Sequence, residues 1–200
     1  MPRPLKENNE RWTYADYLTW PDDERWEIIE GVAYPWNGIQ AMSPGPGKLH
    51  QTVSFEIARQ LGNYLKGRTC RAFAAPFDVR FAEASGQSDN YVETVVQPDL
   101  LVVCDISKLD EKGCIGAPDL IIEISSVATG KRDLTTKFDL YQRYGVKEYW
   151  IIHPAEQTLL VFKLGADGVY GAADRYAGDD KVPVTLLGEL VIDLGSVFAN

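Results

Sequence analysis

Residues 117–126 read Ala-Pro-Asp-Leu-Ile-Ile-Glu-Ile-Ser-Ser, and this stretch decides the fold. Its centre, 120–124, is almost continuously apolar, which is typical of a central strand covered on both faces. Burying a carboxylate such as Glu123 inside such a strand is costly unless it is paired, hydrogen-bonded or bound to a metal. The stretch therefore predicts a central strand and a candidate functional residue on it.

A second carboxylate, Asp99, follows Pro98 and enters the apolar run 100–103. Neighbouring strands lie about 4.8 Å apart, so Asp99 and Glu123 could reach one divalent cation. Oxygen ligands favour Mg²⁺ or Mn²⁺ over Zn²⁺. Asp119 lies about 13 Å from Glu123 along one strand, so we interpret it as a strand-entry residue. For Asp99 and Glu123, a purely structural, hydrogen-bonded role stays open as the alternative.

Two helices flank these strands in the sequence. Apolar residues recur every four positions over 50–66, which predicts a helix that ends at Gly67. A second helix is expected over 131–144. Further strands are expected over 26–29, 32–36, 71–81, 148–152, 158–164 and in the tail, 169–198. The order predicts an α/β fold, a mixed β-sheet flanked by helices with extra C-terminal β-strands. We expect one domain over 1–200, with 1–11 flexible.

Composition limits the partners that the chain can have. Lys and Arg total 20 against 29 Asp and Glu, a net charge of −9, so DNA binding would need a local basic strip or a bound cation. Lys131, Arg132 and Arg143 are the candidates for such a strip. The sequence shows neither a membrane-spanning run nor an apolar leader, and a cytoplasmic protein is expected. Its three cysteines are therefore predicted to be reduced thiols, with Cys104 a small core residue.

The order of four motifs resembles that of a known family. The motifs are Pro98-Asp99, the stretch 116–126, Arg-Asp-Leu-Thr-Thr-Lys-Phe-Asp-Leu-Tyr at 132–141, and Gly-Val-Lys-Glu-Tyr-Trp-Ile-Ile at 145–152. Residues 26–31, 42–44, 50–51 and 76–80 add to the resemblance. Together they resemble the Uma family of restriction-endonuclease-like proteins, a branch of the PD-(D/E)XK nuclease superfamily. The resemblance runs roughly from Thr13 to the C-terminus and implies a restriction-endonuclease-like core.

The resemblance also implies a set of site residues. Asp99 matches the first catalytic acid and Glu123 the second, and with the Ile124 carbonyl they would hold Mg²⁺ or Mn²⁺. The superfamily usually has a lysine two residues after the second acid, where this chain has Ser125. The resemblance implies that in this branch the lysine has migrated to the following helix, where this chain has Lys137.

Further candidates for the site are His50, Glu56, Asp78 and Ser125. His50 matches a recurrent family histidine, with helix capping or packing as an equal alternative. Glu56 and Asp78 are candidate third acids, with a structural role as the alternative, and Ser125 can hydrogen-bond. The chain departs from the family at Val127, where relatives often have Pro, and at His153, where they often have Asp, so we do not assign His153 to catalysis.

These residues imply a metal-dependent endonuclease that hydrolyses DNA phosphodiester bonds. Two alternatives stay open. One is a catalytically silent member of the fold that acts as a DNA-binding or protein-interaction module. The other is hydrolysis of a smaller phosphoester. A homodimer is expected by analogy, because double-strand cleavage generally needs two sites.

Overall fold

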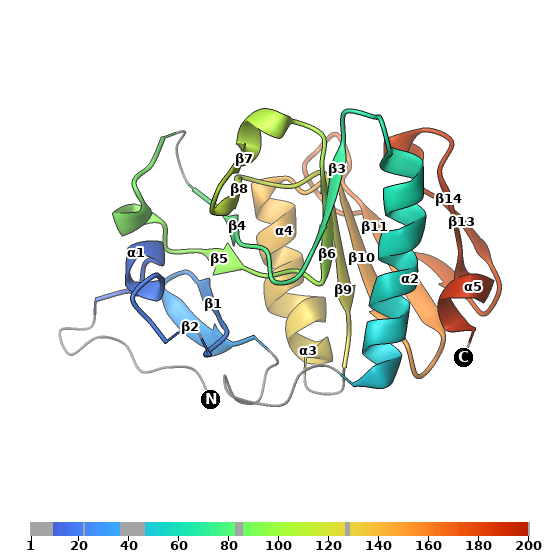
Figure 1. Ribbon diagram of the computed structural model, residues 1–200, viewed down its shortest axis with the longest axis horizontal. Coiled ribbons are helices and arrows are strands. Elements are labelled where there is room, and N and C mark those ends of the chain that lie inside the picture. The colour runs from blue at the N-terminus through green and yellow to red at the C-terminus, as the bar shows by residue number, and fades with distance from the viewer. Residues whose placement is uncertain (1–9, 22, 37–46, 83–85, 127–128, 200) are drawn as a thin grey trace.

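The computed structural model describes residues 10–21, 23–36, 47–82, 86–126 and 129–199 (Figure 1). Over these residues the strands form two six-stranded sheets and a two-stranded hairpin. Residues 1–9, most of the segment expected to be flexible, lie outside this description, as do 42–44 and Val127. Among the described helices, none combines the length and apolarity that crossing a membrane requires.

The sheet that carries the quoted stretch has the strand order β12-β11-β10-β9-β6-β3. Strands β9 and β10 are parallel, and the other neighbours are antiparallel, so the predicted mixed sheet is confirmed. The six strands are β3 (Arg71–Ala74), β6 (Leu100–Val103), β9 (Leu120–Ile124), β10 (Glu148–His153), β11 (Thr158–Lys163) and β12 (Asp174–Ala177). β6 and β9 are central neighbours, which brings the two segments bearing Asp99 and Glu123 together.

Helices cover both faces of this sheet (Figure 1). One face packs against α2 (Lys48–Leu65), whose apolar stripe of one residue every four is fully buried, as its spacing predicts. The same cluster includes the hairpin β13 (Lys181–Pro183) and β14 (Val191–Asp193), together with α5 (Leu194–Phe198). The opposite face packs against α4 (Phe138–Tyr144).

The predicted second helix has a non-uniform geometry. It begins as α3 (Gly130–Arg132), continues as a π-helical turn, η3 (Asp133–Lys137), and ends as α4. Gly145 closes it in the left-handed conformation, at φ 80°, which glycine adopts without the steric cost of a Cβ. A π turn shifts the side chains that follow it, and such turns are frequent at functional sites. Lys137 is the last residue of this turn.

A second sheet attaches the N-terminal hairpin to the core. Its strand order is β2-β1-β5-β4-β8-β7, where β1 is Trp26–Ile29, β2 Val32–Pro35, β4 Val79–Arg80, β5 Val95–Val96, β7 Leu109–Asp110 and β8 Gly113–Ile115. Ile28 of β1 pairs with Val95 of β5, a few residues before Asp99. The strands expected over 26–29 and 32–36 pair as an antiparallel hairpin, which lies beside the segment that leads into β6. The short helix α1 (Tyr14–Tyr17) precedes it, with Thr13 forming a capping box.

Two of the three cysteines form a disulfide, so the prediction of three reduced thiols is wrong. Cys70 and Cys104 lie directly before β3 and after β6, and the register that pairs Arg71 with Val103 places them opposite each other. Cys104 is partly buried rather than a core residue. The spacing of 34 residues gives no signal of this pairing, because only the antiparallel register brings the two residues together. Cys114 is free and buried.

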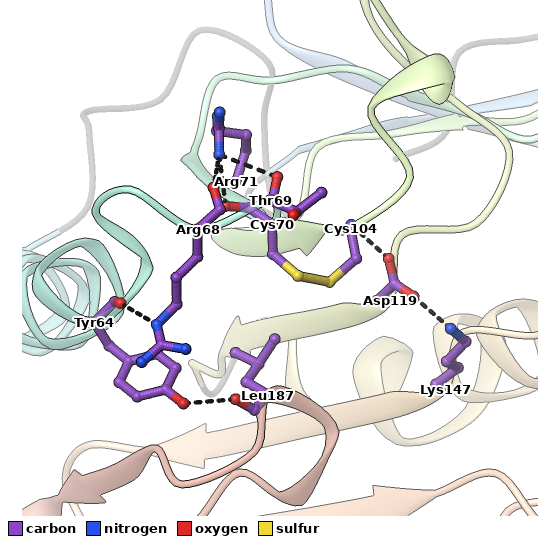
Figure 2. The surroundings of a disulfide bond; sticks show 9 residues. All are labelled: Tyr64, Arg68, Thr69, Cys70, Arg71, Cys104, Asp119, Lys147 and Leu187. Carbon is purple, nitrogen blue, oxygen red and sulfur yellow. Dashed lines mark hydrogen bonds and ion pairs between the residues drawn. A yellow bond between two sulfur atoms is a disulfide. The ribbon is translucent and has the colours of Figure 1, made fainter.

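Asp119 stabilises the same end of the sheet (Figure 2). Its carboxylate accepts hydrogen bonds from the Cys104 backbone N–H at 2.7 Å and from Lys147 Nζ at 2.6 Å. It directly precedes β9, so its interpretation as a strand-entry residue is confirmed.

We expect the thiol count to depend on both unfolding and reduction. Native protein purified without reductant should react slowly with maleimide, because Cys114 is fully buried and burial raises its pKa to about 11. Unfolding should expose one thiol, and reduction should raise the count to three. Mass spectrometry of the labelled protein measures this, and a Cys114→Ala variant should give no label before reduction. Three reactive thiols without reductant would contradict the disulfide.

Candidate active site

Glu123 points to the face of the sheet covered by α4. Leu120, Ile122 and Ile124 belong to the cluster packed on α2, so the alternation of the strand turns Ile121 and Glu123 to the other side. The Glu123 side chain is buried, and its Oε1 accepts hydrogen bonds from Lys137 Nζ at 2.8 Å and Tyr141 Oη at 2.7 Å. Lys137 and Tyr141 are four residues apart, which places them on one face of the helix.

Asp99 lies at the adjacent end of β6 and is also buried. Its Oδ2 accepts the backbone N–H of Ile124 at 2.7 Å, which fixes it next to Glu123 in space. Its Oδ1 lies 3.2 Å from Nε2 of His50, in the first turn of α2. The structure therefore brings together Asp99, Glu123, Ile124, Lys137 and His50, which come from four separate segments of the chain.

Three of the weaker candidates have other surroundings. Glu56 Oε1 and Oε2 accept from Arg59 and Gln60 on its own helix, α2. Asp78 accepts from the Tyr14 hydroxyl and from Gln97 Nε2, both at 2.8 Å. Ser125 is buried, and its hydroxyl has no hydrogen-bond partner among the described residues. These contacts give Glu56 and Asp78 structural partners, and Gln97 links Asp78 to Glu27.

Glu27, on β1, is a site residue that the sequence analysis missed. It is fully buried, and its Oε1 forms an ion pair with Lys137 Nζ at 2.8 Å and accepts a hydrogen bond from the Gln97 backbone N–H at 3.1 Å. The available signal was the one that identified Glu123, a carboxylate among apolar strand residues (Trp-Glu-Ile-Ile, 26–29). The strand is short and belongs to a hairpin that reads as peripheral, so its Glu gave no reason to expect burial beside a distant lysine.

Arg132 also belongs to this cluster, so the prediction that it forms part of a basic surface strip is wrong. Its side chain is 13% exposed, and Nη2 lies 3.1 Å from Glu27 Oε2. The same guanidinium donates to the carbonyls of Pro35 and Trp36 at the end of β2. The Arg132 guanidinium therefore contacts partners inside the protein and is not available to DNA. Arg143 pairs with the exposed Glu30, and Lys131 is exposed.

The comparisons with known proteins agree with this architecture. The sequence profile of the family Uma2, described as "Putative restriction endonuclease", matches residues 14–195. The chain belongs to the Uma2 family. A comparison with curated proteins finds no match. Among solved structures, a crystal structure titled as a putative nuclease belonging to DUF820, from Anabaena variabilis ATCC 29413, is similar with a TM-score of 0.69 at 24% identity. The alignment covers 94% of this chain and 97% of that one, and it shows the same fold.

The Uma2 match includes every residue of the cluster, which carries an excess of acid. Glu27, Asp99, Glu123 and Asp133 are buried carboxylates, whereas Lys137 and Arg132 supply the adjacent cations. Burial raises the pKa of Glu123 to about 8, an effect that Lys137 opposes and the other carboxylates reinforce. Burial also lowers the pKa of Lys137, but Glu123 and Glu27 outweigh this and raise it above its ordinary value. Lys137 is therefore the stable cation of the Uma2 site.

The residues present fit a partly hydrated Mg²⁺ or Mn²⁺ better than a metal caged by protein. No group of three or more His, Cys, Asp or Glu side chains arranged for a metal occurs in the described part of the chain. Asp99, Glu123 and the Ile124 carbonyl would supply three oxygens, and Mg²⁺ typically takes one or two carboxylates and completes its shell with water and phosphate. Asp99 Oδ2 already accepts one hydrogen bond and Oδ1 contacts His50, but a carboxylate oxygen has a second lone pair. A dication would also offset the negative charge of the neighbouring carboxylates, which reinforces the effect of burial on the pKa of Glu123.

We expect Lys137→Met to destabilise the protein strongly. It would leave Glu123 and Glu27 buried without their shared cation, and breaking a buried pair in this way costs about 3–5 kcal/mol. Urea denaturation followed by circular dichroism measures the change. The matched control is Lys131→Met, at an exposed position of the same helix, which should stay within about 0.5 kcal/mol of wild type. Equal effects of the two substitutions would contradict the burial of the ion cluster.

Proposed function

We propose that the chain is a Mg²⁺- or Mn²⁺-dependent endonuclease that hydrolyses DNA phosphodiester bonds. The observation that carries the proposal is the hydrogen bond from Lys137 Nζ to Glu123 Oε1, beside Asp99. Two carboxylates that can hold a metal and one ammonium that can stabilise negative charge, from the start of β6, β9 and η3, suit the hydrolysis of a phosphodiester. The description of the Uma2 family supports the same reaction class.

Each residue would have a distinct role in this reaction. Asp99, Glu123 and the Ile124 carbonyl would hold the cation, which supplies Lewis acidity at the phosphate and a more acidic water. Lys137, whose raised pKa keeps it protonated, would stabilise the negative charge that develops on the phosphoryl oxygens or orient the attacking water. His50 would fix the orientation of Asp99 through their 3.2 Å contact.

A catalytically silent interaction module is the competing proposal, and one observation favours it. The net charge is −9, and Arg132, a basic residue expected to meet DNA, is turned inward onto Glu27. Weak attraction for the phosphate backbone follows from that charge. The two proposals differ in whether the carboxylate pair binds a metal and whether bound metal supports cleavage.

Cleavage of supercoiled plasmid with Mg²⁺ or Mn²⁺ tests the proposal. We expect Asp99→Asn and Glu123→Gln to lose at least about 100-fold in rate, because each removes a charged ligand from the reacting centre. The matched control is Glu56→Gln, an acid of α2 that pairs with Arg59 and should keep the wild-type rate. A folded wild-type protein that cleaves neither supercoiled, linear nor single-stranded DNA with either metal would overturn the nuclease proposal. Activity on small phosphoesters alone would favour the alternative of small-phosphoester hydrolysis.

Calorimetric titration with Mn²⁺ separates a nuclease from a protein that has lost its metal site. Wild type should bind, and Asp99→Asn should not. His50→Ala should bind about 10–100-fold more weakly, since removing a group that orients a ligand typically has that effect. Unchanged Mn²⁺ affinity in Asp99→Asn would contradict the assigned ligands. The homodimer stays a prediction, which sedimentation velocity with and without DNA would test.

A further inference from the structure

Glu27 contacts the ammonium of the site rather than the carboxylate pair. It is the most buried carboxylate of the cluster, with an exposed fraction of 0%, although it is carried by an edge hairpin. Its Oε1 lies 2.8 Å from Lys137 Nζ, the same distance that separates Lys137 Nζ from Glu123 Oε1. Lys137 is therefore held between two carboxylates from two different sheets.

This arrangement fixes where the third ammonium proton can point. A lysine ammonium has three donors on a flexible stem, so one acceptor alone leaves its direction poorly defined. Glu123 accepts one hydrogen bond from the ammonium and the Glu27 ion pair restrains it from a second side, which leaves a donor for another acceptor, such as a phosphoryl oxygen or a water. Only Glu123 of these two would also be engaged by a metal, so Glu27 is the acceptor whose whole charge stays with Lys137.

Glu27 has two further contacts besides Lys137. Its Oε1 accepts the backbone N–H of Gln97, two residues before Asp99, and its Oε2 lies 3.1 Å from Arg132 Nη2. Arg132 in turn donates to the carbonyls of Pro35 and Trp36. The hairpin, the segment leading to Asp99 and the helix bearing Lys137 thus meet at one carboxylate.

We propose that Glu27 is a positioning residue for phosphodiester hydrolysis and acts through Lys137. The N-terminal hairpin is then a working part of the site, because it supplies the carboxylate that aims the ammonium. This inference rests on the proposed nuclease function. It differs from a purely structural role in one consequence: removal of the Glu27 charge changes turnover through Lys137 and leaves metal and substrate binding intact.

Steady-state cleavage kinetics at saturating Mn²⁺ provide the first test. Glu27→Gln keeps the shape of the side chain and removes its charge, so we expect kcat to fall about 10–100-fold while KM and Mn²⁺ affinity stay within about 3-fold. Glu27→Asp, which restores the charge, should recover part of kcat. The matched control is Glu30→Gln, three residues along the same hairpin in an exposed pair with Arg143, which should leave both constants unchanged. A wild-type kcat in folded Glu27→Gln overturns the inference and leaves the nuclease proposal standing.

A double-mutant cycle provides the second test and needs no cleavage activity. In the wild-type background, Glu27→Gln should lower the urea midpoint of unfolding, because it removes a carboxylate from Lys137. In the Lys137→Met background, the same substitution should raise that midpoint, because it removes a buried charge left without its partner. Where Lys137→Met retains measurable cleavage, Glu27→Gln should cause no further loss of kcat in that background. Equal shifts in both backgrounds would show that the two residues act independently and overturn the inference. An inactive wild type with a coupled cycle would instead overturn the nuclease proposal and leave the Glu27–Lys137 pairing intact.

Discussion

The ammonium of Lys137 between the carboxylates of Glu123 and Glu27 is the interaction on which the site depends. All three groups are almost completely buried, and a buried charge is tolerated only with close partners. The triad joins a central strand, a hairpin from the start of the chain and a helix that follows the central strand. Removing Lys137 leaves two buried carboxylates without their shared cation, and removing either carboxylate leaves Lys137 with a single close partner, so all three segments contribute to the site.

The backbone brings these groups together through two regular features and one irregular one. Alternation along β9 sends Glu123 to the face opposite α2, and the antiparallel pairing of β6 with β9 sets Asp99 beside it. The irregular feature is the π turn over Asp133–Lys137, at the end of which Lys137 reaches Glu123. At the other end of β6, the Cys70–Cys104 disulfide and Asp119 tie the sheet together.

In the proposed reaction, a bound dication would balance the acid excess of the cluster, and an acidic chain could thereby act on a phosphate. Its net charge of −9 gives DNA little general attraction, and Arg132 is engaged internally. A dication held by Asp99 and Glu123 would supply positive charge locally, where the scissile phosphate must lie. The affinity for DNA would then depend on the metal more than on a basic surface. The cation of the site itself, Lys137, is buried and paired with two carboxylates.

The sequence by itself determined the central strands, the two main helices and the identity of Asp99, Glu123 and Lys137 as candidates. The strands, helices and two acids could be predicted because apolar runs and four-residue periodicity are local, and because a charge in an apolar strand is conspicuous, whereas Lys137 became a candidate through the resemblance to the family. Only the tertiary structure revealed Glu27, the inward turn of Arg132 and the Cys70–Cys104 pair. Each of these depends on which strands become neighbours: β1 beside β5 carries Glu27 to Lys137, and the β3–β6 register carries Cys70 to Cys104. Such pairings follow from the packing of the whole chain, and no local pattern of residues encodes them.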